Sequence, residues 1–247
     1  MSLLNRLFGS KPKFDAAITP AVPFFAIGDV HGCLGKMQTL LQAISAKDAE
    51  APIIFVGDYV DRGEQSAQVL AHVMEMDANP NVTCLIGNHE EMMLSFLDDP
   101  QKKGARWLRY GGLQTLASFG VRGIATGMKG EALDQAASGL REAMGDEMIA
   151  WLRALPTHWV SGNIAVVHAA ADPGLPMSEQ SAKTLRWGHP DFEDEVRTDG
   201  TWVLHGHTIV DQAHMTAGRI AIDTGAYATG RLTAAHVTAG DVTFISV

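Results

Sequence analysis

Five short polar segments of this 247-residue sequence carry side chains that bind divalent metals. They read GDVHG, GDYVDRG, GNHE, VVHA and HGHT. Carboxylate, amide and imidazole groups suit manganese, iron or zinc, so neither cysteine is needed as a ligand. The candidate ligands are Asp29, His31, Asp58, Asn88, His168 and His207. Each segment alone is more often a turn or a structural histidine, but all five together predict a metal site.

Two ions that lie a few ångströms apart need a bridging carboxylate, and Asp58 in the second segment is the natural bridge. The other ligands divide into Asp29 and His31 on one side, and Asn88, His168 and His207 on the other. Such a pair binds a water molecule, lowers its pKa and holds it for in-line attack on phosphorus. The chemistry expected from these residues is therefore hydrolysis of a phosphoester without a protein nucleophile.

Each polar segment follows a short apolar run that is typical of a buried strand. The first three runs, Phe24–Ile27, Ile53–Val56 and Val82–Ile86, each precede a helical pattern. Successive strand–helix units predict parallel strands, whose carboxyl ends form the ligand-binding edge of a sheet. Further strands are predicted at residues 164–167, 202–204, 219–222, 232–237 and 242–245, the last two as a hairpin.

The chain is expected to form one domain, residues 21–247, after an N-terminal tail at residues 1–20. Residues 104–155 have a mainly helical pattern and predict a cap insertion, whereas residues 171–200 predict a long surface loop. His158, beside Trp159, is expected in a bend.

The formal net charge is −9, and no stretch gathers Lys or Arg. A nucleic-acid partner is therefore not expected. No apolar run approaches the roughly 20 residues that cross a bilayer, and the first residues lack a secretory signal pattern. With only two cysteines, a disulfide framework is excluded. We expect a cytoplasmic protein, and the composition does not determine its oligomeric state.

The three N-terminal segments, followed by His168 and His207, resemble the bacterial branch of the phosphoprotein phosphatase family of calcineurin-like metallophosphoesterases. The resemblance runs from about Ala26 to Ala235. It implies an α/β fold with a central two-sheet β-sandwich flanked by helices, in four layers. It also implies two divalent metals, with manganese favoured over iron or zinc. By motif match, Asp29, His31 and Asp58 hold the first metal, and Asp58, Asn88, His168 and His207 hold the second.

The same resemblance implies roles for three further residues. His89 becomes the general acid that protonates the leaving oxygen, Asp61 orients it, and Arg62 clamps phosphate oxygens. A positioned proton donor is worth about 10²–10⁴-fold when a poor alkoxide leaves. The planar fork of Arg62 suits a phosphate.

The sequence departs from the family pattern at two places. VVHAA has Ala170 where a glycine is usual, and LRWGH has His189 where a phosphate-binding arginine often falls. Candidates for this second clamp are Arg186, which ranks first, and His189, Arg109 and Arg106. In the closing segment AIDTGAYATG, Asp223 and Tyr227 are candidates for contacts near the metals or the substrate.

The expected activity is that of a serine/threonine protein phosphatase acting on a phosphorylated protein or peptide, or on a small phosphoester. The alternative is a symmetrical dinucleoside polyphosphate hydrolase, such as a diadenosine tetraphosphate hydrolase. Asp61 and Glu90 favour the phosphatase, because the nucleotide hydrolases tend to lack the first carboxylate and to have GNHD. A binding module without catalysis is the third hypothesis, and the intact set of ligands, with His89 and Arg62, opposes it.

Overall fold

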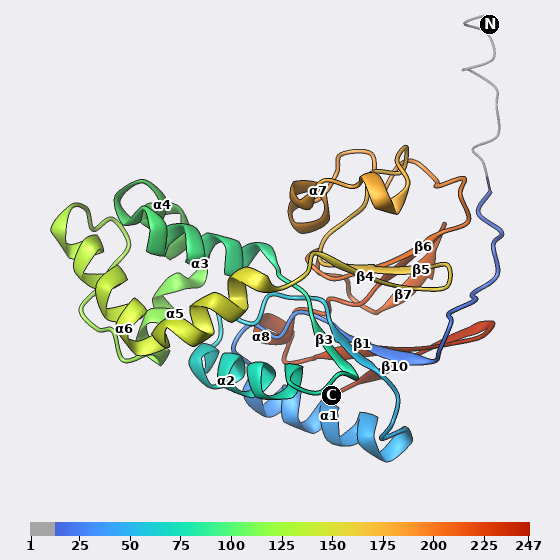
Figure 1. Ribbon diagram of the computed structural model, residues 1–247, viewed down its shortest axis with the longest axis horizontal. Coiled ribbons are helices and arrows are strands. Elements are labelled where there is room, and N and C mark those ends of the chain that lie inside the picture. Colours follow the sequence, from blue (N-terminus) through green and yellow to red (C-terminus); the bar gives the residue numbers. More distant parts are fainter. Residues whose placement is uncertain (1–12) are drawn as a thin grey trace, which may run out of the picture.

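The computed structural model describes residues 13–247, which form two five-stranded sheets that face each other (Figure 1). The N-terminal part of the predicted tail, residues 1–12, lies outside the described residues. Its remainder runs along the ends of both sheets, where Ile18 is buried and its carbonyl oxygen accepts a hydrogen bond from the Gly240 N–H. These residues therefore cover one end of the sandwich.

The first sheet has the strand order β10-β9-β1-β2-β3. Its parallel strands are β1 (Phe24–Ile27), β2 (Ile53–Phe55) and β3 (Val82–Cys84), joined by α1 (Leu34–Lys47) and α2 (Ser66–Asp77). The antiparallel strands β9 (Thr233–Thr238) and β10 (Asp241–Ser246) complete it as a hairpin. The predicted strand–helix units and the C-terminal hairpin are confirmed.

The second sheet has the order β4-β5-β6-β8-β7. Its strands are β4 (His158–Ser161), β5 (Ile164–Val167), β6 (Trp202–His205), β7 (His214–Thr216) and β8 (Arg219–Ala221). The sequence analysis missed β4 and β7, the two edge strands, and its placement of His158 in a bend is wrong. Their side chains are largely exposed, so neither strand shows the apolar run by which the central strands were found.

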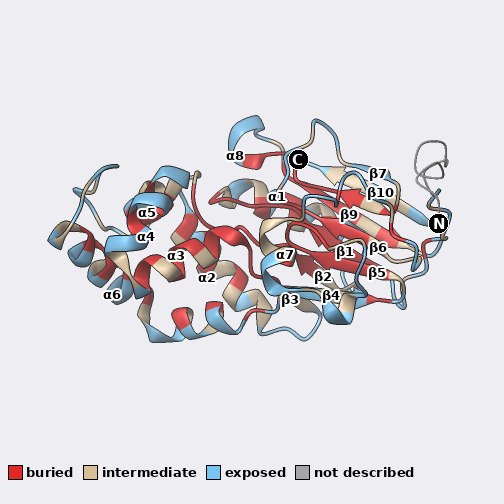
Figure 2. Cartoon of the chain, turned by 90° about the horizontal axis from the view of Figure 1, so that it is seen from above, coloured by how far each residue is buried: buried red, intermediate tan, exposed pale blue. Residues whose placement is uncertain are grey.

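The core lies between the sheets and on their outer faces (Figure 2). Successive side chains of a strand point to opposite faces, so Phe24 and Ala26 of β1 face the second sheet, whereas Phe25 and Ile27 face α1 and α2. A smaller apolar cluster that includes Leu185 and Phe192 covers the outer face of the second sheet. The expected α/β sandwich of two sheets flanked by helices is confirmed.

A helical lobe projects from the carboxyl ends of the strands, at the left of Figure 1. It contains α3 (Asn88–Asp98), α4 (Pro100–Trp107), a π-helical turn (Leu108–Gly112), α5 (Leu113–Ser118) and α6 (Glu131–Ala154). Three short helices lie elsewhere: a 3₁₀ turn (Met177–Glu179), α7 (Ala182–Trp187) and α8 (Ala226–Thr229). Within residues 13–247, no helix combines the length and the apolar character that a membrane span requires.

The apolar layer between the sheets should dominate stability. We expect Ile220→Ala, in a fully buried position of β8, to lower the free energy of unfolding by about 2–5 kcal/mol. The matched control Ile209→Ala removes the same atoms from a side chain that is 43% exposed, and should change stability by about 0.5 kcal/mol or less. Urea titration of both variants measures the difference, and equal effects would contradict this assignment of the core.

Candidate metal centre

The candidate ligands lie where the strands of both sheets end. Asp29 and His31 follow β1, Asp58 follows β2, Asn88 begins α3 after β3, His168 follows β5, and His207 follows β6. The parallel strands of each sheet point the same way, so residues far apart in the sequence meet at one edge of the sandwich. The structure thus brings the predicted residues into one place.

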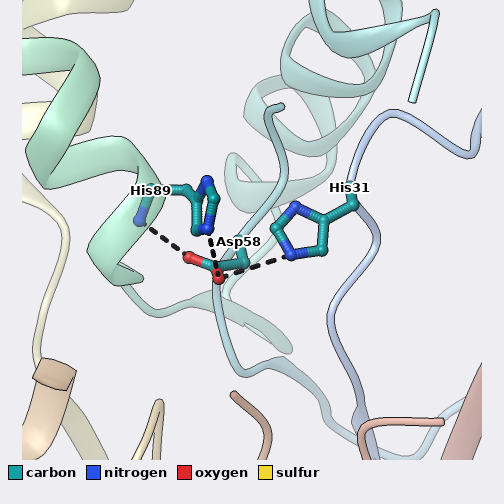
Figure 3. A group of neighbouring side chains, drawn as sticks. All are labelled: His31, Asp58 and His89. Atoms are coloured by element: carbon teal, nitrogen blue, oxygen red, sulfur yellow. Dashed lines mark hydrogen bonds and ion pairs between the residues drawn. The ribbon is translucent and has the colours of Figure 1, made fainter. Parts of the chain in front are cut away.

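Asp58 lies at the centre of this cluster and is 2% exposed. Its Oδ2 atom is 3.5 Å from Nε2 of His31, 3.4 Å from Nε2 of His168 and 3.9 Å from Nε2 of His89. Figure 3 shows the carboxylate between the rings of His31 and His89, with Oδ1 accepting a hydrogen bond from the His89 backbone N–H. Two groups of ligand atoms share Asp58: one with His31 and His89, the other with His168 and His207.

The Nε2 atoms of His31 and His168, which face Asp58, carry a lone pair and no proton. Nδ1 of His31 donates to the Val60 carbonyl at 2.7 Å, and Nδ1 of His168 donates to the Val56 carbonyl at 3.0 Å. Burial lowers the pKa of both imidazoles well below the usual value, so they are neutral and their Nε2 atoms carry no proton. Backbone carbonyls that fix the tautomer in this way are typical partners of metal-binding histidines.

Asn88 adds an oxygen to the same cluster. Its Oδ1 atom lies 2.9 Å from Nε2 of His168 and 3.1 Å from Nδ1 of His207. The unprotonated His168 nitrogen and the Asn88 amide oxygen are both acceptors, and they converge beside the carboxyl group of Asp58, whose pKa burial raises well above the usual value. A cation is the group that satisfies such an arrangement, and the residues present fit a divalent metal.

Asp29 lies beside this cluster but outside both of its three-residue groups. Its carboxylate accepts from the His207 backbone N–H at 3.1 and 3.2 Å. Burial, together with the nearby carboxylates of Asp223 and Asp58, raises the pKa of Asp29 well above the usual value. A bound cation would offset the repulsion between these buried carboxylates, so Asp29 is suited to bind the same metals as the other candidate ligands.

The loops of the cluster have an unusual backbone conformation. Of the six non-glycine residues with positive φ among the described residues, five belong to the candidate site: His31, Asp58, Asp61, Arg62 and His207. Left-handed conformations cost about 1–3 kcal/mol each and gather at functional sites, where surrounding contacts hold them.

Two glycines permit the carboxylates to approach the backbone. A Cβ atom on Gly87 would lie 2.1 Å from Oδ1 of Asp58, and one on Gly206 would lie 2.0 Å from Oδ1 of Asp29. Any side chain at either position would displace a candidate ligand.

Glu90 holds the Asp58 loop in place. Its Oε2 atom accepts from the N–H groups of Asp58 and Gly87, both at 2.9 Å. Its Oε1 atom accepts from the N–H groups of Tyr59 and Val60, at 2.8 and 3.2 Å. Burial raises the pKa of Glu90 to about 7, while these four N–H groups lower it. The last residue of GNHE is therefore a clamp on the backbone of two site loops.

His89 is oriented by a buried carboxylate. Its Nδ1 atom lies 2.6 Å from Oδ2 of Asp61, whose carboxylate also accepts from the Trp107 indole N–H at 3.0 Å and the Thr115 hydroxyl at 2.7 Å. Burial raises the pKa of Asp61 to about 8, while the Thr115 and Trp107 hydrogen bonds lower it. Burial and the charge of Arg62 lower the pKa of His89 to about 3. Trp107 and Thr115 come from the helical lobe, and the sequence analysis did not identify their role.

Arg62 and Tyr227 lie together at the edge of the cluster. The Arg62 guanidinium donates to the Tyr227 hydroxyl at 2.9 Å, lies 4.7 Å from the Tyr227 ring centroid, and is 3.2 Å from Nε2 of His89. Its backbone N–H bonds to the Gly111 carbonyl at 3.3 Å, which ties it to the π-helical turn. Tyr227 remains 38% exposed, so both side chains can reach a bound molecule.

The candidates for a second phosphate clamp form other contacts. Arg186 forms an ion pair with Glu91 at 2.9 Å. Arg109 donates to the Ala105 carbonyl of its own helical segment at 3.0 Å. Arg106 lies over the ring of Trp187, with the guanidinium carbon 4.5 Å from the centroid. His189 lies 3.4 Å from the Asp172 carboxylate. None of these contacts joins them to the candidate metal ligands.

Comparison with known proteins supports the assignment of these residues to a phosphoesterase site. The family model described as calcineurin-like phosphoesterase matches residues 22–211. A Ralstonia nicotianae protein named symmetrical bis(5'-nucleosyl)-tetraphosphatase is 28% identical over 261 residues, which cover 88% of this chain and 90% of that protein.

Two solved structures have the same fold at 18% identity. One is a candidate diadenosine tetraphosphatase, with a TM-score of 0.63, and the alignment covers 94% of this chain and 98% of that one. The other is the cold-active protein-tyrosine phosphatase of a psychrophilic Shewanella, with a TM-score of 0.57, covering 92% and 83%. The fold is thus shared by proteins with different substrates.

These findings correct the expected activity. The prediction of a serine/threonine protein phosphatase is wrong, because the relative that aligns along almost the whole chain is a tetraphosphatase. The prediction is based on Asp61 and Glu90, and the structure gives both residues contacts within the protein. Both side chains are fully buried, and both direct their oxygens at protein groups. They contact His89 and the backbone of the Asp58 loop, and neither carboxylate is directed at a place where a substrate could bind.

The match over residues 22–211 also decides the family. It includes every candidate metal ligand from Asp29 to His207, in the order and at the strand ends described above. The chain therefore belongs to the calcineurin-like phosphoesterase family.

Proposed function

We propose that this protein is a metal-dependent hydrolase that splits dinucleoside tetraphosphates, such as diadenosine tetraphosphate, into two nucleoside diphosphates. The observation that carries the proposal is the convergence of unprotonated histidine nitrogens, the Asn88 oxygen and buried carboxylates on one point beside His89 and Arg62. The name of the Ralstonia nicotianae relative supports the choice of substrate.

The ligand sets proposed here are those of the motif match. Asp29, His31 and Asp58 would hold one divalent cation, and Asp58, Asn88, His168 and His207 would hold the other. When bound, the cations polarise the phosphoryl group and make water a better nucleophile. Manganese is the metal we propose, following the resemblance to the phosphoprotein phosphatases. The donors, nitrogen and oxygen atoms without thiolate, suit manganese, iron or zinc.

The remaining residues bind and protonate the substrate. Arg62 offers a planar fork to the phosphate oxygens, and stacking on Tyr227 holds that fork in place. His89 donates Nδ1–H to Asp61 and has a free lone pair at Nε2. The anionic phosphates of a bound substrate favour the charged imidazolium, so His89 takes up a proton from water at Nε2 and passes it to the leaving oxygen. The oxygen of water forms a bond to phosphorus, the bond between phosphorus and the bridging oxygen breaks, and the nucleoside diphosphate leaves with that oxygen. No covalent bond to the protein forms.

Removal of the metal tests the proposal directly. We expect chelation with EDTA to abolish hydrolysis of diadenosine tetraphosphate, and added Mn²⁺ to restore it. Asp58→Asn, which keeps the shape of the side chain and removes the charge between the histidines, should stay inactive in Mn²⁺.

Chromatography of the products provides the readout. Two ADP molecules per substrate are expected, and AMP with ATP would contradict symmetrical cleavage. A phosphothreonine peptide, measured in parallel, should be the poorer substrate in kcat/KM. A metal-free protein with full activity would contradict the mechanism.

Asp61 should act as a positioning residue. We expect Asp61→Asn to lower kcat by about 10²-fold or more with a small effect on KM, because an amide placed among three donors reverses the hydrogen bonding of His89. Asp98→Asn is the control, since Asp98 pairs with Arg153 on the surface. A change confined to KM would contradict the assigned role.

Glu90 should be required for a stable Asp58 loop. Glu90→Gln leaves two backbone N–H groups without an acceptor, at about 1–3 kcal/mol each. We therefore expect its free energy of unfolding to fall by about 2 kcal/mol or more, and its Mn²⁺ affinity to fall as well. Glu64→Gln, an exposed position on the same loop, should behave like the wild type. Urea titration and calorimetric Mn²⁺ binding measure both effects, and unchanged values for Glu90→Gln would contradict the clamp.

A further inference from the structure

A cavity adjoins the candidate metal centre. It has a volume of about 350 Å³ and is lined by His207 and Thr208 on the metal side, and by Trp187, His189 and Phe192 of α7 and the following loop. This volume falls within the range of about 300–1,000 Å³ that is usual for small-molecule pockets. Because His207 is both a candidate metal ligand and a lining residue, the cavity lies next to the place where the metals would bind.

Trp187 forms a fixed aromatic wall of the cavity. Its indole N–H donates to Glu91 Oε2 at 3.0 Å, and Glu91 in turn pairs with Arg186 at 2.9 Å. The Arg106 guanidinium lies over the ring, 4.5 Å from its centroid. Contacts from α3 and α4 thus hold the ring of a residue at the end of α7, and a ring held in this way loses little entropy when it stacks on a ligand.

The charge of the lining excludes one class of ligand. Among the described residues that line this cavity, none is Lys or Arg, and Glu193 contributes a carboxylate. At a distance from the metals, a phosphate group would meet the Glu193 carboxylate there and no lysine or arginine side chain. An uncharged aromatic group with polar substituents fits better, because it can stack on Trp187 and exchange hydrogen bonds with Thr208, His189 and Glu193.

We propose that this cavity is a nucleoside subsite, in which Trp187 stacks on the base of one half of the substrate while the phosphates lie at the metals. This inference rests on the proposed function, since it assigns the nucleoside of a dinucleoside tetraphosphate to a place in the protein. Trp187 is then a residue that determines specificity for nucleotides over simple phosphoesters.

The test compares an aromatic with an aliphatic replacement in the Mn²⁺-loaded protein. Base stacking on an aromatic side chain is worth about 1–3 kcal/mol, so Trp187→Leu should weaken ADP binding by about 5- to 100-fold in calorimetry. Trp187→Phe should stay close to the wild type. Trp151→Leu is the matched control, because Trp151 is also half-buried and donates its indole N–H to a carboxylate, that of Asp77.

The affinity of the same proteins for inorganic phosphate is measured as well. It distinguishes the loss of a nucleoside subsite from damage to the metal centre, which would weaken the binding of both ligands. In Trp187→Leu the affinity for ADP should fall far more than that for phosphate, and the ratio of kcat/KM for diadenosine tetraphosphate to that for 4-nitrophenyl phosphate should fall with it. Equal losses for ADP and phosphate, or no loss of ADP affinity, would overturn the subsite.

The outcomes also distinguish this inference from the proposed function. A wild-type protein that neither cleaves diadenosine tetraphosphate nor binds ADP contradicts the proposed function. A wild-type protein that does both, with a Trp187→Leu variant that behaves identically, contradicts only the nucleoside subsite.

Discussion

The hydrogen bonds of Glu90 are the contact on which the rest of the site depends. One buried carboxylate accepts four backbone N–H groups and so joins the loop after β2 to the turn that begins α3. Asp58 is held there in a left-handed conformation, with φ of 54°, that an isolated chain would rarely adopt. The carbonyls of Val60 and Val56 orient His31 and His168 so that their Nε2 atoms face Asp58. Glu90 therefore places the carboxylate, and backbone carbonyls place the rings around it.

A second buried carboxylate connects the site to the helical lobe. Asp61 accepts hydrogen bonds from Trp107 and Thr115, which are 46 and 54 residues away in sequence. Its Oδ2 atom also accepts a hydrogen bond from Nδ1 of His89. The π-helical turn between α4 and α5 adds the Gly111 contact to Arg62. The lobe therefore helps to orient His89 and Arg62, the proposed proton donor and phosphate clamp, and a movement of its helices would displace both side chains.

The wall of the proposed nucleoside subsite comes from a different part of the chain than the candidate metal ligands. Trp187 and His189 belong to α7 and the loop after it, which pack on the outer side of the second sheet. This segment is where the sequence departs from the phosphatase pattern, and Arg186, the favoured second clamp, pairs with Glu91 instead. Members of one fold can thus keep the same metal ligands while loops outside the sheets select the substrate.

Much of the site could be predicted from the sequence, because a metal ligand at the end of a strand belongs to a short, recognisable pattern of neighbouring residues. An apolar run, a glycine and an Asp, Asn or His lie within a few residues of one another, and the parallel topology brings such segments to one edge. The edge strands β4 and β7 could not be found in this way, since their exposed side chains leave no apolar run.

Only the tertiary structure decided what Asp61, Glu90 and Trp187 do. Asp61 and Glu90 are acidic residues within the motifs, and the sequence does not show whether a carboxylate faces the substrate or the backbone of its own protein. That distinction depends on burial and on partners distant in sequence. The sequence by itself thus determined the fold class and the candidate metal ligands, through periodicity and spacing, whereas specificity depends on surfaces that exist only once the chain is folded.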